Sequence, residues 1–277
     1  SPSPLLPDTE FVTDAQYLMI ESVYGDRNHE HRSERKSMLE DVIEDTINKG
    51  GTLMIPAFSL ERTQELLYEL KEMTEGGRIP KVPIFLDSPL AIKVTAIYQK
   101  YAGYYKEEVW QKLHLGEDLF SFQGLVPTLT TEESKSINDV LPPKIIIAGS
   151  GMSNGGRIVH HEERYLPDPK NTLLLMGYQA PGTLGRILQD GTPRVTIHGR
   201  QVPVRARVTT ISGYSAHKDS DSLIDFVHRG ADQLEHVFVV LGEPKSSLFL
   251  VQKIRDSIGL DATAPRVGEF VELRMSN

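Results

Sequence analysis

The chain lacks cysteine, an excess of positive charge and any long apolar run. Without cysteine it can form neither a disulfide bond nor a thiolate metal site. No segment approaches the roughly 18 apolar residues of a membrane-spanning helix, so we expect no membrane partner. No secretory signal is recognisable at Ser1, which makes the cytoplasm the expected location.

The formal net charge of −8 argues against a general electrostatic attraction to nucleic acid. One stretch is an exception, because residues 157–207 hold eight Lys or Arg against four Asp or Glu. Charge asymmetry of this kind can steer an anionic substrate toward one part of the surface.

Short aliphatic runs alternate with amphipathic stretches through the middle of the chain. The runs predict buried strands at residues 52–58, 82–87, 145–147 and 171–177. The stretches between them have the periodicity of helices. Aliphatic strands that alternate with helices indicate an α/β fold whose parallel sheet is covered on both faces.

The pattern changes near residue 200. From Arg194 apolar and polar residues alternate, which predicts a hairpin with its turn at residues 198–200. Helices and strands then follow to a last predicted strand near residues 270–273. We therefore expect boundaries that divide the chain into residues 1–27, 28–200 and 201–277, with the first and last segments joined as one unit.

The stretch Lys144–His161, KIIIAGSGMSNGGRIVHH, indicates a strand, a glycine-rich loop and a helix. Glycines let a backbone approach a ligand, and the N–H groups at a helix N-terminus attract anions. One interpretation of the loop is therefore a phosphate-binding site. A plain tight turn is the alternative. The glycine spacing matches neither the dinucleotide fingerprint nor the P-loop. His160 and His161 point to different sides of the helix, which makes them poor joint ligands.

Several polar residues follow predicted strands, where the ligands of parallel sheets bind. Glu21 ends the apolar run at residues 17–20, and a solvated strand end is its plain interpretation. Asp87 precedes a helix start and is expected to be structural. His29 and His31 form an H-x-H pair, but their charged surroundings favour a solvated turn over a metal site.

Five phrases together resemble one known family. They are ESVYGDR at 21–27, PAFSLERTQELL at 56–67, DSPLA at 87–91, GSGMSNGGRIVHH at 149–161 and GYSAHKD at 213–219. In this order they resemble the β-CASP branch of the metallo-β-lactamase superfamily. The resemblance implies a Rossmann-like β-CASP domain inserted into a metallo-β-lactamase αββα sandwich, of which this chain holds the C-terminal part. It also implies a zinc-dependent nuclease that acts on RNA, single-stranded RNA included.

Carried over by motif, Glu21 matches the family's acidic motif and His217 its histidine motif, so we expect them to be catalytic. A carboxylate bonded to an imidazole can deliver a proton to the leaving oxygen. A capping or packing histidine is the alternative for His217. We expect phosphate contacts from Arg62, Ser150, Gly151, Ser153, Gly155, Gly156, Arg157, Gly182 and Thr183.

Two departures from the family pattern concern metal. The H-x-H-x-D-H motif, which supplies most zinc ligands in the family, is absent from these 277 residues. The resemblance implies two zinc ions in a full-length protein, but most of their ligands are missing from this chain. We therefore assign no metal ligand. Leu241 occupies the position before Gly-Glu where ribonuclease members carry a ligating histidine. An aliphatic side chain cannot bind zinc.

The sequence thus favours a fragment of a metal-dependent ribonuclease that is inactive without the upstream half. Leu241 leaves two alternatives: a non-catalytic nucleic-acid-binding partner subunit, or a DNA-acting β-CASP nuclease. A homodimer or a pairing with a related subunit is compatible with each. A Rossmann-like small-molecule enzyme is a weaker alternative, because no standard nucleotide fingerprint is present.

Overall fold

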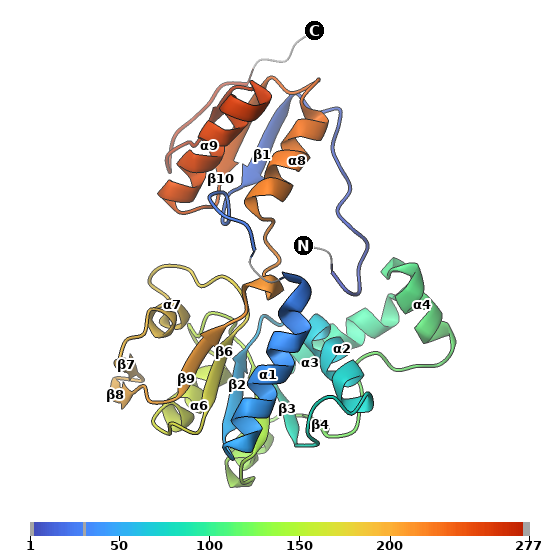
Figure 1. Cartoon of the computed structure of the whole chain (residues 1–277), viewed down its shortest axis with the longest axis vertical. Coiled ribbons are helices and arrows are strands. Elements are labelled where there is room, and N and C mark those ends of the chain that lie inside the picture. The colour runs from blue at the N-terminus through green and yellow to red at the C-terminus, as the bar shows by residue number, and fades with distance from the viewer. Residues whose placement is uncertain (1–2, 30–31, 274–277) are drawn as a thin grey trace. The chain divides into compact units, whose positions relative to one another are not determined.

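The computed structural model describes residues 3–29 and 32–273 of the chain. The chain forms two compact units, one from residues 2–7 and 31–216 and one from residues 8–30 and 217–277. Each unit is an α/β structure with a parallel sheet (Figure 1). Among the described residues, no helix is both long and apolar enough to cross a membrane.

The larger unit is built on a six-stranded sheet in the order β4-β3-β5-β2-β6-β9. All of its strand pairs are parallel. The strands are β2 (Thr52–Pro56), β3 (Ile84–Asp87), β4 (Leu125–Pro127), β5 (Lys144–Ala148), β6 (Thr172–Leu175) and β9 (Arg207–Thr210). Every residue of β2, β3, β5 and β6 is buried, as expected for strands covered on both faces.

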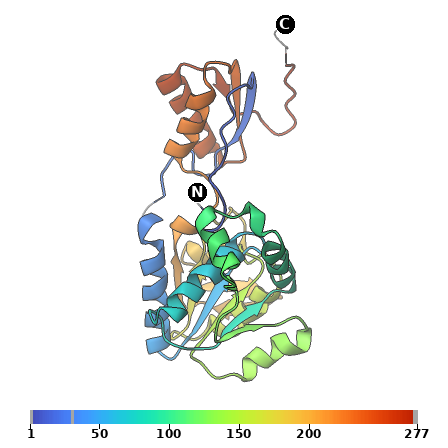
Figure 2. The same ribbon diagram turned by 90° about the vertical axis from the view of Figure 1, so that its right-hand side faces the viewer.

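Alternate residues of these strands enter two different cores. Leu53 and Ile55 pack in the cluster that contains Leu39 of α1 (Arg35–Asn48) and Leu67 of α2 (Arg62–Glu75). Met54 lies instead in the cluster on the other face. That cluster includes residues of α6 (Arg157–Tyr165), of α7 (Leu184–Gln189) and of the hairpin formed by β7 (Arg194–Ile197) and β8 (Arg200–Pro203). This two-residue alternation shows that each face carries its own layer. Figures 1 and 2 show the sheet from two directions, with α1 in front of it in Figure 1.

The remaining elements of the larger unit connect these strands. The helices are α1 (Arg35–Asn48), α2 (Arg62–Glu75), α3 (Pro89–Lys100), α4 (Glu107–His114), α5 (Thr131–Ser136), α6 (Arg157–Tyr165) and α7 (Leu184–Gln189). Strands β7 (Arg194–Ile197) and β8 (Arg200–Pro203) form the predicted hairpin. Short 3₁₀ turns are η1 (Arg32–Glu34), η2 (Ala102–Tyr104), η3 (Ile137–Asp139) and η4 (Ser212–Tyr214).

The smaller unit is a three-stranded parallel sheet in the order β1-β10-β11. It consists of β1 (Tyr17–Glu21), α8 (Ser220–Gly230), β10 (His236–Val240), α9 (Pro244–Ile258) and β11 (Ala262–Thr263). Its core joins Ile20 and Val239 of the sheet to Leu223 of α8 and Leu250 of α9. Met19, the residue of β1 just before Ile20, points the other way and has 71% of its surface exposed.

Two expectations from the sequence differ from this structure. The second boundary, expected at residue 200, lies between Ala216 and His217, because β9 pairs with β6 and completes the larger sheet. The first boundary lies close to the expected residue 28. The predicted strand near residues 270–273 is wrong. Among the described residues the last strand is β11, which ends at Thr263, and residues 270–273 are not in a strand.

Candidate functional site

Glu21 and His217 are in direct contact within the smaller unit. Glu21 is the last residue of β1, and the His217 ring lies with its Nδ1 atom 2.6 Å from Glu21 Oε2. The other carboxylate oxygen, Oε1, accepts a hydrogen bond of 3.1 Å from the backbone N–H of Lys218. Both side chains are partly exposed, by 42% for His217 and 23% for Glu21. The pair is therefore held in place at its base and remains accessible to solvent.

The loop that carries His217 is anchored on both sides. Asp219 caps α8 by accepting a hydrogen bond from the N–H of Ser222, and it also forms a bridge with Tyr24. The carbonyl of His217 lies 2.9 Å from Nε2 of His29. Capping is thus the task of Asp219, while the His217 ring contacts Glu21. The His217 side chain is therefore not the cap of α8.

His29 makes two structural contacts. Its ring packs against that of Tyr24, with 4.3 Å between the ring centroids. Together with the bond to the His217 carbonyl, this contact makes His29 a support of the loop. The second histidine of the H-x-H pair, His31, lies outside the described residues.

The glycine-rich loop lies in the larger unit between β5 and α6, as predicted. Gly156 has φ +75° and precedes α6, and a Cβ atom there would lie 2.4 Å from the Gly149 carbonyl oxygen. A Cβ atom on Gly151 would lie 2.6 Å from the Phe58 ring. Close packing of the loop therefore requires both glycines. At Gly155 a Cβ atom would meet nothing within 4 Å.

Most polar side chains of the predicted phosphate site bond within the protein. Ser150 Oγ accepts a bond from the N–H of Asn154, and the buried Ser153 donates to Glu162. Thr183 caps α7, and Gly182 beside it has φ +83°. Arg62 lies with only 5% of its surface exposed and donates to Glu65. Its inward position does not support the expected phosphate contact.

Asp87 is the centre of a buried network at the end of β3. Its Oδ1 accepts hydrogen bonds from Thr128 at 2.6 Å and Arg157 at 2.8 Å. Its Oδ2 accepts one from Ser134 and lies 2.7 Å from Nε2 of His161, both within the same unit. Burial favours a higher pKa, but the bonds from His161, Thr128 and Ser134 outweigh it and lower the pKa of Asp87 to about 2. The structural role expected for Asp87 agrees with these contacts.

Glu162 was not singled out by the sequence. It is completely buried on α6, where Ser153 is its one described hydrogen-bond partner and Oε2 has none. Burial raises the pKa of Glu162 to about 8, against a smaller lowering by the Ser153 bond. Its signal in the sequence is weak, because HHEER looks like an ordinary charged helix surface.

Comparison with known proteins identifies both parts of the chain. A Beta-Casp domain signature matches residues 63–188, and the signature of a Zn-dependent metallo-hydrolase RNA specificity domain matches residues 201–265. The chain belongs to the β-CASP family. The family predicted from the five phrases is thereby confirmed.

Several relatives match nearly the whole chain. Ribonuclease TTHA0252 of Thermus thermophilus is 38% identical over 96% of this chain and 60% of its own length. An RNase J-like protein of Methanocaldococcus jannaschii is 31% identical over 97% of this chain and 62% of its own. Transcription termination factor FttA of Pyrococcus horikoshii is 34% identical over 93% of this chain and 40% of its own. The chain thus spans between two fifths and about three fifths of these relatives.

Leu241 follows β10 at the same strand-end edge as Glu21, because Glu21 aligns with Val240 in the sheet register. Its side chain is 79% exposed and its φ is +58°, which is uncommon for a bulky residue. The turn beyond it is tight, since a Cβ atom on Gly242 would lie 2.3 Å from Ser22 Oγ. An exposed aliphatic group therefore occupies the position expected for an imidazole.

The residues at this edge do not by themselves fit a zinc ion. A zinc site needs three or four N, O or S ligands. Glu21 and His217 are bonded to each other, and Leu241 offers no ligand atom. In the described part of the chain, the one group of three His or acidic residues with closely spaced ligand atoms is His160, Glu163 and His198 in the larger unit. Zinc at the Glu21 edge would need ligands from outside this set.

Proposed function

We propose that this chain supplies the proton-transfer pair and part of the RNA-binding surface of a metal-dependent ribonuclease. The observation that carries the proposal is the 2.6 Å contact between Glu21 and His217 across 196 positions of sequence. Membership in the β-CASP family and the match to an RNA specificity domain support RNA as the substrate. The named ribonuclease relative supports hydrolysis as the reaction.

The proposal gives each atom of the pair a role. Glu21 Oε2 accepts the Nδ1–H of His217, which orients the ring and leaves Nε2 as the nitrogen that exchanges a proton with substrate. A protonated His217 would donate its Nε2 proton to the leaving oxygen as the phosphodiester bond breaks. The Lys218 N–H holds the second oxygen of Glu21 and prevents the carboxylate from turning away.

The attack on phosphorus is not assigned to this chain. Its sequence contains no H-x-H-x-D-H segment, and the described residues at the Glu21 edge do not complete a zinc site. We therefore propose that the purified 277-residue chain binds RNA without cleaving it. Measurable, metal-dependent hydrolysis by this chain, free of contaminating nuclease, would contradict that part of the proposal.

The pair is tested in the longest form of the protein that its gene encodes. Glu21→Gln and His217→Asn keep the shapes of the side chains but remove the carboxylate and the proton-transferring imidazole. We expect each to lower the single-turnover rate of RNA cleavage by roughly 10²–10⁴. RNA affinity, measured by fluorescence anisotropy, should stay at the wild-type value.

A double variant separates a coupled pair from two independent groups. If Glu21 acts through His217, the double variant should be no slower than His217→Asn alone, because the two effects are not additive. Tyr17→Phe at the start of β1 is the matched control and should cleave normally. Wild-type cleavage rates in both single variants would contradict the catalytic role proposed for Glu21 and His217.

A second candidate function rests on Leu241. Leu241 is exposed at the position where a ligating histidine was expected. The loss of that ligand would suit a non-catalytic partner subunit, which binds RNA without cleaving it. The same longest form distinguishes the candidates: zinc-dependent cleavage supports the ribonuclease, whereas tight RNA binding without cleavage supports the partner subunit. A DNA-acting nuclease would instead cleave single-stranded DNA in preference to RNA of the same sequence.

A further inference from the structure

A basic cavity lies in the larger unit, apart from the Glu21–His217 pair. It has a volume of about 550 Å³ and is lined by side chains of α5, η3, α6 and β8. Four of the lining residues are basic: Lys135, Arg157, Arg164 and Arg200. Glu163 is the one carboxylate among the described residues that line it. The excess of positive charge sets this cavity apart in a chain whose net charge is −8.

The basic side chains differ in how they are engaged. Lys135 and Arg164 are exposed, and neither has an ion-pair partner in the parts of the chain described here. Arg200 lies 3.3 Å from Glu163, whose other oxygen is 2.9 Å from His198. Lys135 and Arg164 thus have no acidic partner among the described residues, and the carboxylate of Glu163 already contacts both Arg200 and His198.

The floor of the cavity is held rigid by the Asp87 network. Arg157, His161 and Ser134 line the cavity, and all three also contact the buried Asp87 carboxylate. Arg157 donates in addition to the carbonyls of Thr128 and Leu129. A preorganised polar surface loses little side-chain entropy when it binds a ligand. The buried aspartate therefore acts as the support of this surface.

A cation is the less favourable occupant. His160, Glu163 and His198 have ligand atoms within 4.8 Å of one another, which is the spacing of a potential metal site. A divalent cation would, however, enter among four basic side chains, and Arg200 already pairs with Glu163. Repulsion by these charges favours an anion over a metal ion.

We infer that this cavity binds phosphate groups of an RNA strand. The inference rests on the proposed function for the identity of the polymer, and on the cavity itself for the chemistry. Lys135 and Arg164 contact the phosphates, while Arg157, whose charge is paired with Asp87, forms part of the floor beneath them. The volume is in the range of sites that hold a small ligand, about 300–1,000 Å³, so a nucleotide of the strand can enter it.

The test removes the two uncompensated cations. Lys135→Ala/Arg164→Ala in the 277-residue chain should weaken binding of a fluorescein-labelled single-stranded RNA roughly tenfold at low salt. The slope of log affinity against log salt concentration should fall by about 1.4, since each phosphate contact contributes about 0.7 for a single strand. Anisotropy titrations at several salt concentrations give both quantities.

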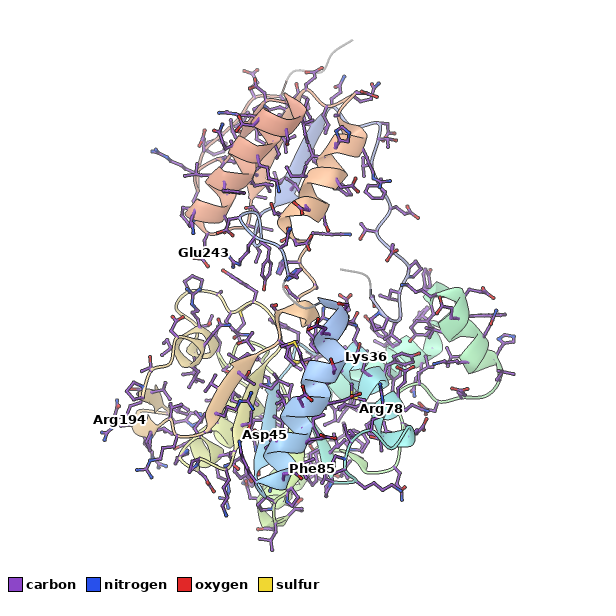
Figure 3. The ribbon with its side chains drawn as sticks, in the orientation of Figure 1. Lys36, Asp45, Arg78, Phe85, Arg194 and Glu243 are labelled. Carbon is purple, nitrogen blue, oxygen red and sulfur yellow. The ribbon has the colours of Figure 1, made fainter. Side chains whose placement is uncertain are left out.

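A matched control removes the same charge elsewhere in the same unit. Lys49→Ala/Arg78→Ala also deletes one lysine and one arginine, both exposed and both paired with an acidic neighbour. Figure 3 shows Arg78 far from Arg194 of the β7–β8 hairpin, whose second strand lines the cavity. The control should bind RNA nearly as tightly as wild type. Equal losses in the two variants, or none in the cavity variant, overturn the inference.

A second arm separates RNA from a free phosphate ligand. Pyrophosphate is titrated calorimetrically into the wild type and the cavity variant. If the cavity variant loses pyrophosphate binding but keeps full RNA affinity, the cavity serves a free phosphate ligand and the RNA inference fails. The proposed function is tested separately, because Glu21→Gln should lose cleavage while retaining RNA affinity.

Discussion

At the scale of single residues, two buried carboxylates have opposite environments. Asp87 has four side-chain partners, two on each oxygen, and its pKa falls to about 2. Glu162 has Ser153 as its described partner and its pKa rises to about 8. Burial raises the pKa of both groups, and only Asp87 has enough hydrogen-bond donors to outweigh it and keep the carboxyl ionised in the folded protein.

Asp87→Asn should destabilise the larger unit by about 3–5 kcal/mol near neutral pH, because Arg157 and His161 lose a buried charged partner. The contribution of Asp87 is present in full above the ordinary carboxyl pKa and is lost as pH falls toward 2. Between pH 5 and pH 2 wild type should therefore lose about 2 kcal/mol more than the variant. Urea unfolding at each pH measures both effects.

The control for this prediction is Asp190→Asn. Asp190 pairs with Arg186 on the surface, where its side chain is 58% exposed. Exposed pairs contribute little, so the change should stay within about 0.5 kcal/mol. A pH profile of Asp87→Asn parallel to that of wild type would show that the network does not hold an ionised Asp87.

The free energy of unfolding of Glu162→Gln should increase relative to that of wild type as pH rises from about 5 to 8. A carboxyl with a raised pKa keeps its proton in the folded state while the unfolded state releases it, so wild-type stability falls over this range. The amide does not titrate and removes this dependence. Unfolding free energies of both proteins across this range provide the measurement, and a constant difference would argue against a protonated Glu162.

At the scale of elements, the β5–loop–α6 segment is shaped by its glycines. Each of two glycines brings the chain against a neighbour that a Cβ atom would strike: Phe58 for Gly151 and the Gly149 carbonyl for Gly156. The loop in turn positions Arg157, the first residue of α6, over Asp87. The glycine pattern therefore serves packing as much as any phosphate contact.

Gly156→Ala should destabilise the larger unit by at least about 2 kcal/mol, because a positive φ and a clash with backbone act together. Gly103→Ala is the control, since its φ is not positive and nothing lies within 4 Å of the added Cβ atom. That change should be neutral or stabilising by up to about 1 kcal/mol. Equal midpoints of thermal unfolding for the two variants would contradict the steric argument.

At the scale of the whole molecule, the apolar residues form separate cores. Two clusters lie on the faces of the larger sheet, and a third holds the smaller unit together. The smaller core unites β1 near the start of the chain with α8, β10 and α9 near its end. Formation of the Glu21–His217 pair depends on this long-range association, since the two residues come from its two segments.

Leu250→Ala should therefore destabilise the smaller unit by about 2–5 kcal/mol, the usual result of a large-to-small change in a core. Amides of β10 should lose protection in hydrogen exchange, whereas amides of β2 and β5 should keep theirs. Leu67→Ala in the larger core is the matched variant and should produce the reverse pattern. Equal loss in both units from either variant would indicate one cooperative core.

Local sequence by itself determined the fold class, most of the strands and the family. Buried strands, glycine loops and helix starts leave short patterns, and each can be read within about 15 residues. The pairing of Glu21 with His217 was expected only through the family motif, because neither residue carries a local sign of the other. The proposed roles of the remaining site residues stay predictions.

Only the tertiary structure decided which distant groups meet. It placed β9 beside β6 and so moved the boundary from residue 200 to residue 217. It also gathered Thr128, Ser134, Arg157 and His161 around Asp87 and turned Arg62 inward toward Glu65. The physical reason is that strand order and side-chain direction depend on long-range pairing and on which face of the sheet each helix covers. Neither is encoded in the periodicity of one segment.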